Sequence, residues 1–362
     1  MVRFTVLASG SKGNCTVVSG GRTRILLDCG LSCRELFRRM KLAGEEPETL
    51  DAIVITHEHQ DHVNGLAVTA RKLGIPVYFT EGTHRAWMRW LTPRRQMTYA
   101  QWLEQCRKQA AERQAEADAA QEEGEPDESD LLEAAEASSE QGGRASRFPT
   151  LAPEKTRKDG ARAFDADETE LVEGQVEAAE AQQEAVEPAQ PKDPTWLPAV
   201  EYFQAGEPFE IGDISVCPFT IPHDAADPVG FVFRAEGVRM AYVTDLGYIP
   251  PNVKVQLAGV DLLLLESNHD LEMLRDGPYP WAVKQRVLSR VGHLSNEAAA
   301  EFLENGYDGQ AAYVILAHLS ESNNLPELAR VTAERALNGR ASLLANRLLL
   351  AAQHEFLSSI LF

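Results

Sequence analysis

The sequence predicts an α/β protein with two β-sheets and helices on their outer sides. Strand-like runs occur in two groups along the chain, and each group is followed by helix-like segments, which is the main observation behind this fold class. A hydrophobic fraction of 44% in a chain of 362 residues is enough for a packed core, so global disorder is excluded. The length allows one large domain or two ordinary ones.

The first group of strands begins at the N-terminus, where short β-rich runs separated by glycines are typical of a meander. The predicted strands are Arg3–Ala8, Cys15–Val18, Thr23–Asp28, Ala52–Thr56 and Val77–Thr80. Apolar residues at helical spacing predict a helix over Leu31–Leu42. A second helix is predicted over Val63–Leu73, where Gly74 ends the pattern.

The second group follows residue 207 and contains the most apolar runs of the chain. The predicted strands are Pro208–Ile211, Ile214–Ile221, Gly230–Arg234, Arg239–Thr244, Val260–Glu266 and Ala312–Ala317. The predicted helices are Trp281–Val291, Asn296–Asn305 and Pro326–Leu337. Runs such as Val260–Glu266 lack polar alternation, which indicates strands that are buried on both faces.

An acidic segment separates the two groups. Residues 104–194 carry a net charge of −15, whereas the whole chain carries −20. The segment is rich in Ala, Glu and Gln and contains only two aromatic residues, Phe148 and Phe164. It therefore lacks the apolar surface needed to offset the conformational entropy lost on folding. We expect a low-complexity insertion that is partly helical and largely disordered.

Several classes of protein are excluded or disfavoured by the remaining composition. No apolar run approaches the ~18 residues that a membrane-spanning helix needs. The first residues read as a strand rather than as a signal peptide. Five scattered cysteines are too few for a disulfide framework. We therefore expect a reduced protein of the cytoplasm.

One short stretch, 56–62, holds three histidines and an aspartate directly after a predicted strand and reads Thr-His-Glu-His-Gln-Asp-His. Alternate residues of an extended chain point the same way, so His57 and His59 face one point. A turn before the next helix can bring Asp61 and His62 to a second point beside it. Imidazole nitrogens and a carboxylate suit borderline divalent metals. The motif thus predicts a metal site rather than a metal-free polar loop.

This H-x-H-x-D-H pattern resembles that of the metallo-β-lactamase-fold hydrolases. Three later residues, each after a predicted strand, resemble the remaining ligands of that family: His223, Asp245 and His318. The resemblance implies a four-layer αββα sandwich formed by residues 1–103 and 195–362, with 104–194 inserted between them. It also implies two divalent metal ions, zinc or manganese. One ion would be held by His57, His59 and His223, the second by Asp61, His62 and His318, and Asp245 would bridge both.

Further stretches resemble one branch of this family, the YycJ/WalJ/VicX proteins, which are related to tRNase Z and to the RNase J exonucleases. They are Ser9–Asn14, Leu26–Gly30, His223–Gly230, Glu266–Asp270 and Gly292–Asn296. The branch normally lacks a counterpart of the acidic insertion. The resemblance implies that Asp61 orients the attacking hydroxide. It also implies that His293, with Glu266, stabilises the phosphate or protonates the leaving oxygen.

The resemblance also suggests residues on the substrate side of the site. They are Ser9, Ser11, Asn14, Asn268, His269 and Ser295. Simpler interpretations remain open: a hairpin turn at 9–14, a loop histidine at 269 and a helix N-cap at Ser295. Asp28 is expected to anchor one of the ligand histidines from behind.

The function implied by the resemblance is that of a metal-dependent phosphodiesterase, specifically a 5′-to-3′ DNA exonuclease with a role in DNA repair. A hydroxide bridging the two metals would attack the phosphorus. DNA is favoured over RNA as the substrate. One alternative keeps the metal site but gives it a small thioester, lactone or cyclic phosphodiester. Another is a non-enzymatic role, in which the acidic insertion binds a basic partner.

Nucleic acid needs cations to bind its backbone, and two basic groups could form a rim. They are Arg34, Arg38, Arg39 and Lys41, and Arg85, Arg89, Arg94 and Arg95. Solvated helix faces are the simpler interpretation of both groups. The insertion could also imitate the charge of nucleic acid and cover the cleft.

Overall fold

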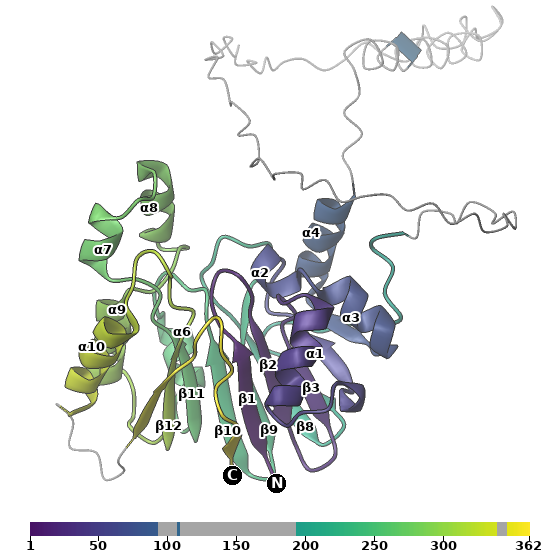
Figure 1. The fold of residues 1–362 in the computed structure, drawn as a ribbon, viewed down its shortest axis with the longest axis horizontal. Coiled ribbons are helices and arrows are strands. Elements are labelled where there is room, and N and C mark those ends of the chain that lie inside the picture. The colour runs from purple at the N-terminus through teal and green to yellow at the C-terminus, as the bar shows by residue number, and fades with distance from the viewer. Residues whose placement is uncertain (93–106, 109–192, 339–345) are drawn as a thin grey trace, which may run out of the picture. The chain divides into compact units, whose positions relative to one another are not determined.

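The computed structural model describes residues 1–92, 107–108, 193–338 and 346–362 (Figure 1). Residues Met1–Pro93 and Gln190–Phe362 form one compact unit. The predicted acidic insertion, 104–194, lies outside the described residues except at positions 107, 108, 193 and 194, so its nature stays a prediction. Within the described part of the chain, no helix is both long and apolar enough to span a bilayer.

Two seven-stranded sheets form the centre of the unit. The first has the strand order β14-β1-β2-β3-β4-β5-β6 and the second β13-β12-β11-β10-β9-β8-β7. In each sheet, antiparallel pairing on one side changes to parallel pairing on the other, at β3–β4 and at β10–β11. The strands of the first sheet are β1 (Arg3–Ala8), β2 (Cys15–Ser19), β3 (Arg24–Leu27), β4 (Ala52–Val54), β5 (Val77–Phe79), β6 (Val200–Tyr202) and β14 (Ile360–Leu361). Those of the second are β7 (Phe209–Ile211), β8 (Ile214–Thr220), β9 (Val229–Ala235), β10 (Val238–Val243), β11 (Leu262–Glu266), β12 (Tyr313–Ala317) and β13 (Arg347–Leu350).

The helices of the described residues follow the parallel strands of each sheet. Those beside the first sheet are α1 (Cys33–Leu42), the short 3-10 helix η1 (Pro47–Thr49), α2 (Gln60–Val63), α3 (Leu66–Leu73) and α4 (Glu81–Leu91). Those of the second half are α6 (Pro251–Gln256), α7 (Leu271–Asp276), α8 (Trp281–Val287), α9 (Asn296–Asn305) and α10 (Pro326–Asn338). Ser32, Thr80, Asp270 and Ser295 cap α1, α4, α7 and α9 with their side-chain oxygens, as expected for these residue types.

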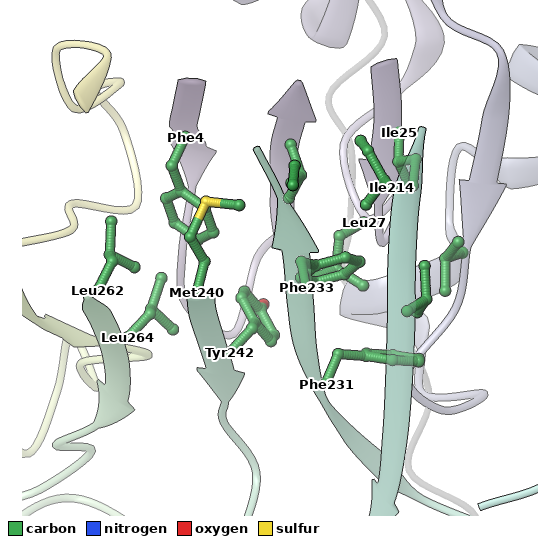
Figure 2. Close-up of a cluster of buried hydrophobic side chains, with 14 of the residues drawn as sticks. Phe4, Ile25, Leu27, Ile214, Phe231, Phe233, Met240, Tyr242, Leu262 and Leu264 are labelled. Carbon is green, nitrogen blue, oxygen red and sulfur yellow. The ribbon is translucent and has the colours of Figure 1, made fainter. Parts of the chain in front are cut away.

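One extensive apolar cluster lies between the two sheets. Figure 2 shows Phe4 and Leu27 of the first sheet opposite Phe231, Phe233 and other residues of the second. Alternate residues of the inner strands belong to different layers, because side chains along a strand point to opposite faces. On β10, Met240 and Tyr242 face the other sheet, whereas Ala241 and Val243 face the helices.

Two further apolar clusters fix the helices to the outer faces of the sheets. Leu36 of α1 and Trp87 of α4 pack against the first sheet. Phe302 of α9 and Ala333 of α10 pack against the second. The layers therefore run helix, sheet, sheet, helix, which confirms the predicted α/β class and the αββα sandwich.

The predicted elements differ from the structure in a few places. The segment predicted as one helix, Val63–Leu73, belongs to two helices, because the helix is interrupted at Gly65. A side chain there would clash with the carbonyl oxygen of Leu31, 1.9 Å from the Cβ position. The helix predicted to end at Val291 ends at Val287. The strands β6, β13 and β14 were not predicted, and β14 is only two residues long.

Candidate metal centre

The predicted metal-binding residues all lie beyond the carboxyl ends of strands, where α/β sheets bind their ligands. His57 follows β4, His223 follows β8, Asp245 follows β10 and His318 follows β12. Asp245 and His318 have positive φ angles of 61° and 56°. This left-handed backbone is unfavourable for residues with a Cβ, by roughly 1–2 kcal/mol each, and it recurs at functional sites.

Three histidines from two distant stretches form the first group of candidate ligands. In His57, His59 and His223, one nitrogen of each ring lies within 4.8 Å of the others. His223 Nε2 is 3.2 Å from His59 Nδ1. Two neutral imidazole nitrogens at this distance present lone pairs to each other unless a cation or a proton lies between them.

The second group combines two carboxylates with two imidazoles, namely Asp61, His62, Asp245 and His318. His318 Nε2 lies 3.3 Å from Asp61 Oδ2 and 3.4 Å from Asp245 Oδ1. Asp245 stands between the two groups: its Oδ2 is 3.3 Å from His62 Nε2 and its Oδ1 is 4.0 Å from His223 Nε2. The structure thus brings together all seven residues predicted to bind metal.

The far nitrogens of these rings contact oxygen atoms that orient them. His62 Nδ1 lies 2.8 Å from Asp28 Oδ2, as expected for Asp28, and His57 Nδ1 lies 3.0 Å from Thr56 Oγ1. His223 Nδ1 is 3.1 Å from the carbonyl oxygen of Val291. Such contacts fix the tautomer in which Nε2 carries no proton and is available as a ligand.

The donor set fits a divalent metal. Among the described residues, the buried atoms His57 Nε2 and Asp245 Oδ2 have no hydrogen-bond partner, which is costly unless a cation binds there. Burial lowers the pKa of His57 well below its ordinary value, so its ring is neutral. Burial also lowers the pKa of His62, but the negative charges of Asp28, Asp61 and Asp245 outweigh it and raise the pKa well above the ordinary value.

Glu266 links the metal centre to His293. Its side chain is fully buried, and its Oε1 accepts from His318 Nδ1 at 3.0 Å and from His293 Nδ1 at 2.8 Å. Its Oε2 accepts from the backbone nitrogens of Leu246 and Leu294. Although burial raises the pKa of Glu266, His293 and His318 lower it to about 2. Glu266 therefore positions two histidines, while the proposed contact with substrate belongs to His293.

A cleft of about 330 Å³ opens over these residues. Asp61, Asp245, His293 and His318 form part of its wall. Four residues around α8 that the sequence did not single out also line it: Tyr279, Val283, Arg286 and Val287. Their sequence signal was weak, since it consisted only of their position between two matched motifs.

The six residues predicted on the substrate side fall into two sets. Ser11 and Asn268 line the cleft, and Asn14 Nδ2 lies 3.1 Å from Asp61 Oδ2. Two of the other three have structural contacts: Ser9 Oγ accepts from the backbone nitrogen of His318, and Ser295 Oγ caps α9. His269 is 1% exposed and does not line the cleft, and burial lowers its pKa to about 4.

In the first predicted basic group, on α1, two of the four residues already have partners within the protein. Arg39 is buried and donates to the carbonyl oxygens of Leu7 and Gln353, while Arg38 pairs with Glu35. On α4, Arg85 pairs with Glu81. Arg94 and Arg95 lie outside the described residues.

Comparison with known families agrees with this geometry. The family described as Metallo-beta-lactamase superfamily matches residues 8–143, and the Beta-lactamase superfamily domain matches residues 127–319, more than half of the chain. The chain therefore belongs to the metallo-β-lactamase superfamily. Proteins of this superfamily typically use divalent metals, and this chain has candidate residues to bind them.

Two curated relatives are similar over most of the chain. Exodeoxyribonuclease YycJ of Bacillus anthracis is 29% identical over 336 residues, 93% of this chain and 89% of that protein. Exodeoxyribonuclease WalJ of Streptococcus pneumoniae is 27% identical over 330 residues, 91% and 86% of the two chains. These matches confirm the resemblance to the YycJ/WalJ branch.

Solved structures support the fold. The metallo-beta-lactamase fold protein YhfI from Bacillus subtilis aligns with a TM-score of 0.53 at 12% identity, over 99% of both chains. Zinc-bound PqqB from Methylobacterium extorquens aligns with a TM-score of 0.52 at 14% identity, over 98% of this chain and 99% of its own. At such low identity, the likeness concerns the fold alone.

Proposed function

We propose that this protein is a metal-dependent phosphodiesterase that degrades DNA as an exonuclease. The observation that carries the proposal is a pair of adjacent ligand groups beside the cleft. Asp245 of the second group lies 4.0 Å from His223 of the first, and His293 lines the same cleft. The named activity of both long relatives, exodeoxyribonuclease, supports DNA as the substrate class. Two zinc or manganese ions fit the nitrogen and oxygen donors.

The chain's own residues have distinct tasks in this proposal. Bound divalent metal would polarise the phosphate and lower the pKa of a water nucleophile. Asp61 accepts a hydrogen bond from that water and orients it, because this carboxylate lines the cleft. Asp28 and Glu266 keep His62 and His318 in the orientation that binds metal.

His293 is placed to act on the phosphate. Its Nδ1 is taken by Glu266, and its ring lines the cleft. Although burial lowers the pKa of His293, the charge of Glu266 raises it above the ordinary value. In its protonated form the ring can bind a phosphate oxygen or protonate the leaving oxygen.

The test is a substrate panel with purified, metal-loaded protein. A 5′-phosphorylated oligonucleotide, bis(p-nitrophenyl) phosphate, S-lactoylglutathione and a homoserine lactone represent phosphodiesters, thioesters and lactones. We expect release of mononucleotides from the oligonucleotide with Mn²⁺ or Zn²⁺ and loss of this activity with EDTA. Hydrolysis of the thioester or lactone alone would replace this proposal with the small-molecule alternative.

Two variants and one control connect the activity to the site. Asp61→Ala and His62→Ala should lose nuclease activity, whereas Asp51→Asn should keep it. Asp51 accepts a backbone hydrogen bond from Arg24 on the surface, and it contributes nothing to the cleft. Full nuclease activity in both site variants would refute the proposed mechanism.

A further inference from the structure

The side of the cleft formed by α8 has a composition that the metal chemistry does not require. Val283, Arg286 and Val287 lie three and four positions apart, so they share one face of α8, and all three line the cleft. Tyr279 precedes the helix and lines the same side. An aromatic ring, two valines and one guanidinium thus line the same cleft as the metal-binding residues Asp61, Asp245 and His318.

This wall is apolar although water reaches it. Val283 is 40% exposed, and Tyr279 and Val287 are half-buried. Pro278 and Pro280 flank Tyr279 and restrict the backbone on both sides of it. The backbone that carries the ring is thereby restricted, which reduces the entropy that this segment loses on binding. Exposed apolar and aromatic surface beside a metal site is what a planar, partly apolar ligand group needs.

Arg286 lies next to the metal centre through one carboxylate. Its Nε donates to Asp224 Oδ2, and Asp224 Oδ1 is 3.5 Å from His223 Nε2. No described residue accepts a hydrogen bond from the terminal nitrogens of this guanidinium, and its side chain is 63% exposed. A guanidinium fork of this kind binds phosphate oxygens in pairs.

We propose that Tyr279, Val283 and Val287 form a subsite for one nucleobase, and that Arg286 binds a phosphate oxygen of the same nucleotide. This inference rests on the proposed function and adds that the nucleotide bound at the site is unpaired. Stacking on Tyr279 requires a base that is not paired, and a cleft of about 330 Å³ is at the small end of ligand sites, which span ~300–1,000 Å³. The site therefore takes an unpaired nucleotide at a strand end.

Two small substrates with the same leaving group isolate the base. Thymidine 5′-(p-nitrophenyl phosphate) carries one base, and methyl p-nitrophenyl phosphate carries none. For the wild type we expect a higher kcat/KM for the thymidine ester. Tyr279→Ala should lower the ratio of the two kcat/KM values by about tenfold, chiefly through KM, since stacking of one base contributes about 5- to 150-fold. Tyr279→Phe keeps the ring and should keep the ratio.

The helix also provides a matched control. Trp281 is 64% exposed and lies two positions from Val283, on the opposite face of α8. Trp281→Ala should leave the ratio unchanged. Arg286→Ala should lower kcat/KM for both esters by about tenfold or more at unchanged metal content, because both contain the phosphate. On DNA, a strand with a 5′ overhang should be degraded faster than a blunt duplex by the wild type, and Tyr279→Ala should reduce that preference.

The possible failures are distinguishable. If the wild type hydrolyses neither ester nor DNA, the proposed function itself is wrong. If it hydrolyses both esters but Tyr279→Ala leaves their ratio unchanged, the proposed function stands and the base subsite is refuted. Sedimentation velocity on each variant adds one check. If Tyr279→Ala changes the oligomeric state and that change accounts for the lower ratio, this wall is an interface between copies of the chain and the subsite is refuted.

Discussion

Replacing Asp28 with asparagine tests the metal centre through a residue behind the candidate ligands. The Asp28 carboxylate is fully buried, and its Oδ1 accepts from the backbone nitrogen of Thr56 at 2.9 Å. Its Oδ2 lies 2.8 Å from His62 Nδ1. Both oxygens must accept, whereas an asparagine offers one acceptor and one donor. In either orientation, the amide group places a donor against Thr56 or against His62.

The size of the effect follows from these contacts. An amide NH₂ facing His62 Nδ1 favours the tautomer that carries its proton on Nε2, the atom 3.3 Å from Asp245 Oδ2. Changes of this kind behind a ligand typically lower metal affinity by about 10- to 100-fold. The orientation that spares His62 instead leaves the buried N–H of Thr56 without an acceptor, which costs about 1–3 kcal/mol of stability.

The assay is competitive metal titration of the metal-free protein, with thermal unfolding of the same samples. Asp51→Asn is the control, because the Asp51 side chain accepts only at the surface, from the backbone nitrogen of Arg24. We expect weaker metal binding for Asp28→Asn and wild-type behaviour for Asp51→Asn. A folded Asp28→Asn protein with metal affinity within about twofold of wild type and an unchanged melting temperature would refute the assignment of His62 as an oriented ligand.

Three further predictions concern other parts of the chain. A Cβ at Gly30 would lie 1.6 Å from the Asp61 carbonyl oxygen, so Gly30→Ala should lose metal binding and have a much lower melting temperature than the control Gly74→Ala. At Gly74 only the φ angle of 69° is unfavourable, which costs about 1–2 kcal/mol. Equal melting temperatures of the two variants would contradict this prediction. Burial raises the pKa of the Cys15 thiol to about 12, so iodoacetamide at about pH 8.5 should label it only after unfolding. Because the pKa of Cys15 is raised in the folded protein, the stability that the neutral thiol contributes is present below the unfolded pKa and is lost as the pH rises towards 12. Labelling of Cys15 in the native protein, detected by mass spectrometry, would refute the burial argument. Deleting 104–194 should leave hydrolysis intact if the segment is an insertion into the catalytic domain. Faster turnover of the deletion variant at low salt would show that the segment covers the cleft, and failure of that variant to fold would contradict the predicted domain boundaries.

The sequence predicted most of the fold because most of its strands are buried, apolar runs. Val260–Glu266 and Ala312–Ala317 are continuous apolar runs, and the structure places strands there within two residues of the predicted bounds. The missed strands are short and partly exposed. In β6, Glu201 and Tyr202 are exposed, so the run Val200–Tyr202 has no apolar pattern to detect.

The candidate site was predictable to different degrees. Residues 57–62 form a local motif whose chemistry is visible without a fold. His223, Asp245 and His318 are single residues after strands, and only the family resemblance connected them to that motif. Arg286 carries no local signal, because a basic residue on a helix most often faces solvent. Its importance comes from the fold, which brings it to Asp224, 62 positions away in the sequence.

The backbone at the strand ends indicates how the fold maintains the centre. Asp28, Asp245 and His318 all have φ between 56° and 61°, directly after β3 and near the ends of β10 and β12. Each costs roughly 1–2 kcal/mol, so the chain must hold these conformations through other contacts. Those contacts are present: the backbone nitrogen of Asp28 donates to Val54, and that of His318 donates to Ser9 Oγ. The side chains are therefore aimed before any ligand arrives, as a preorganised catalytic centre requires.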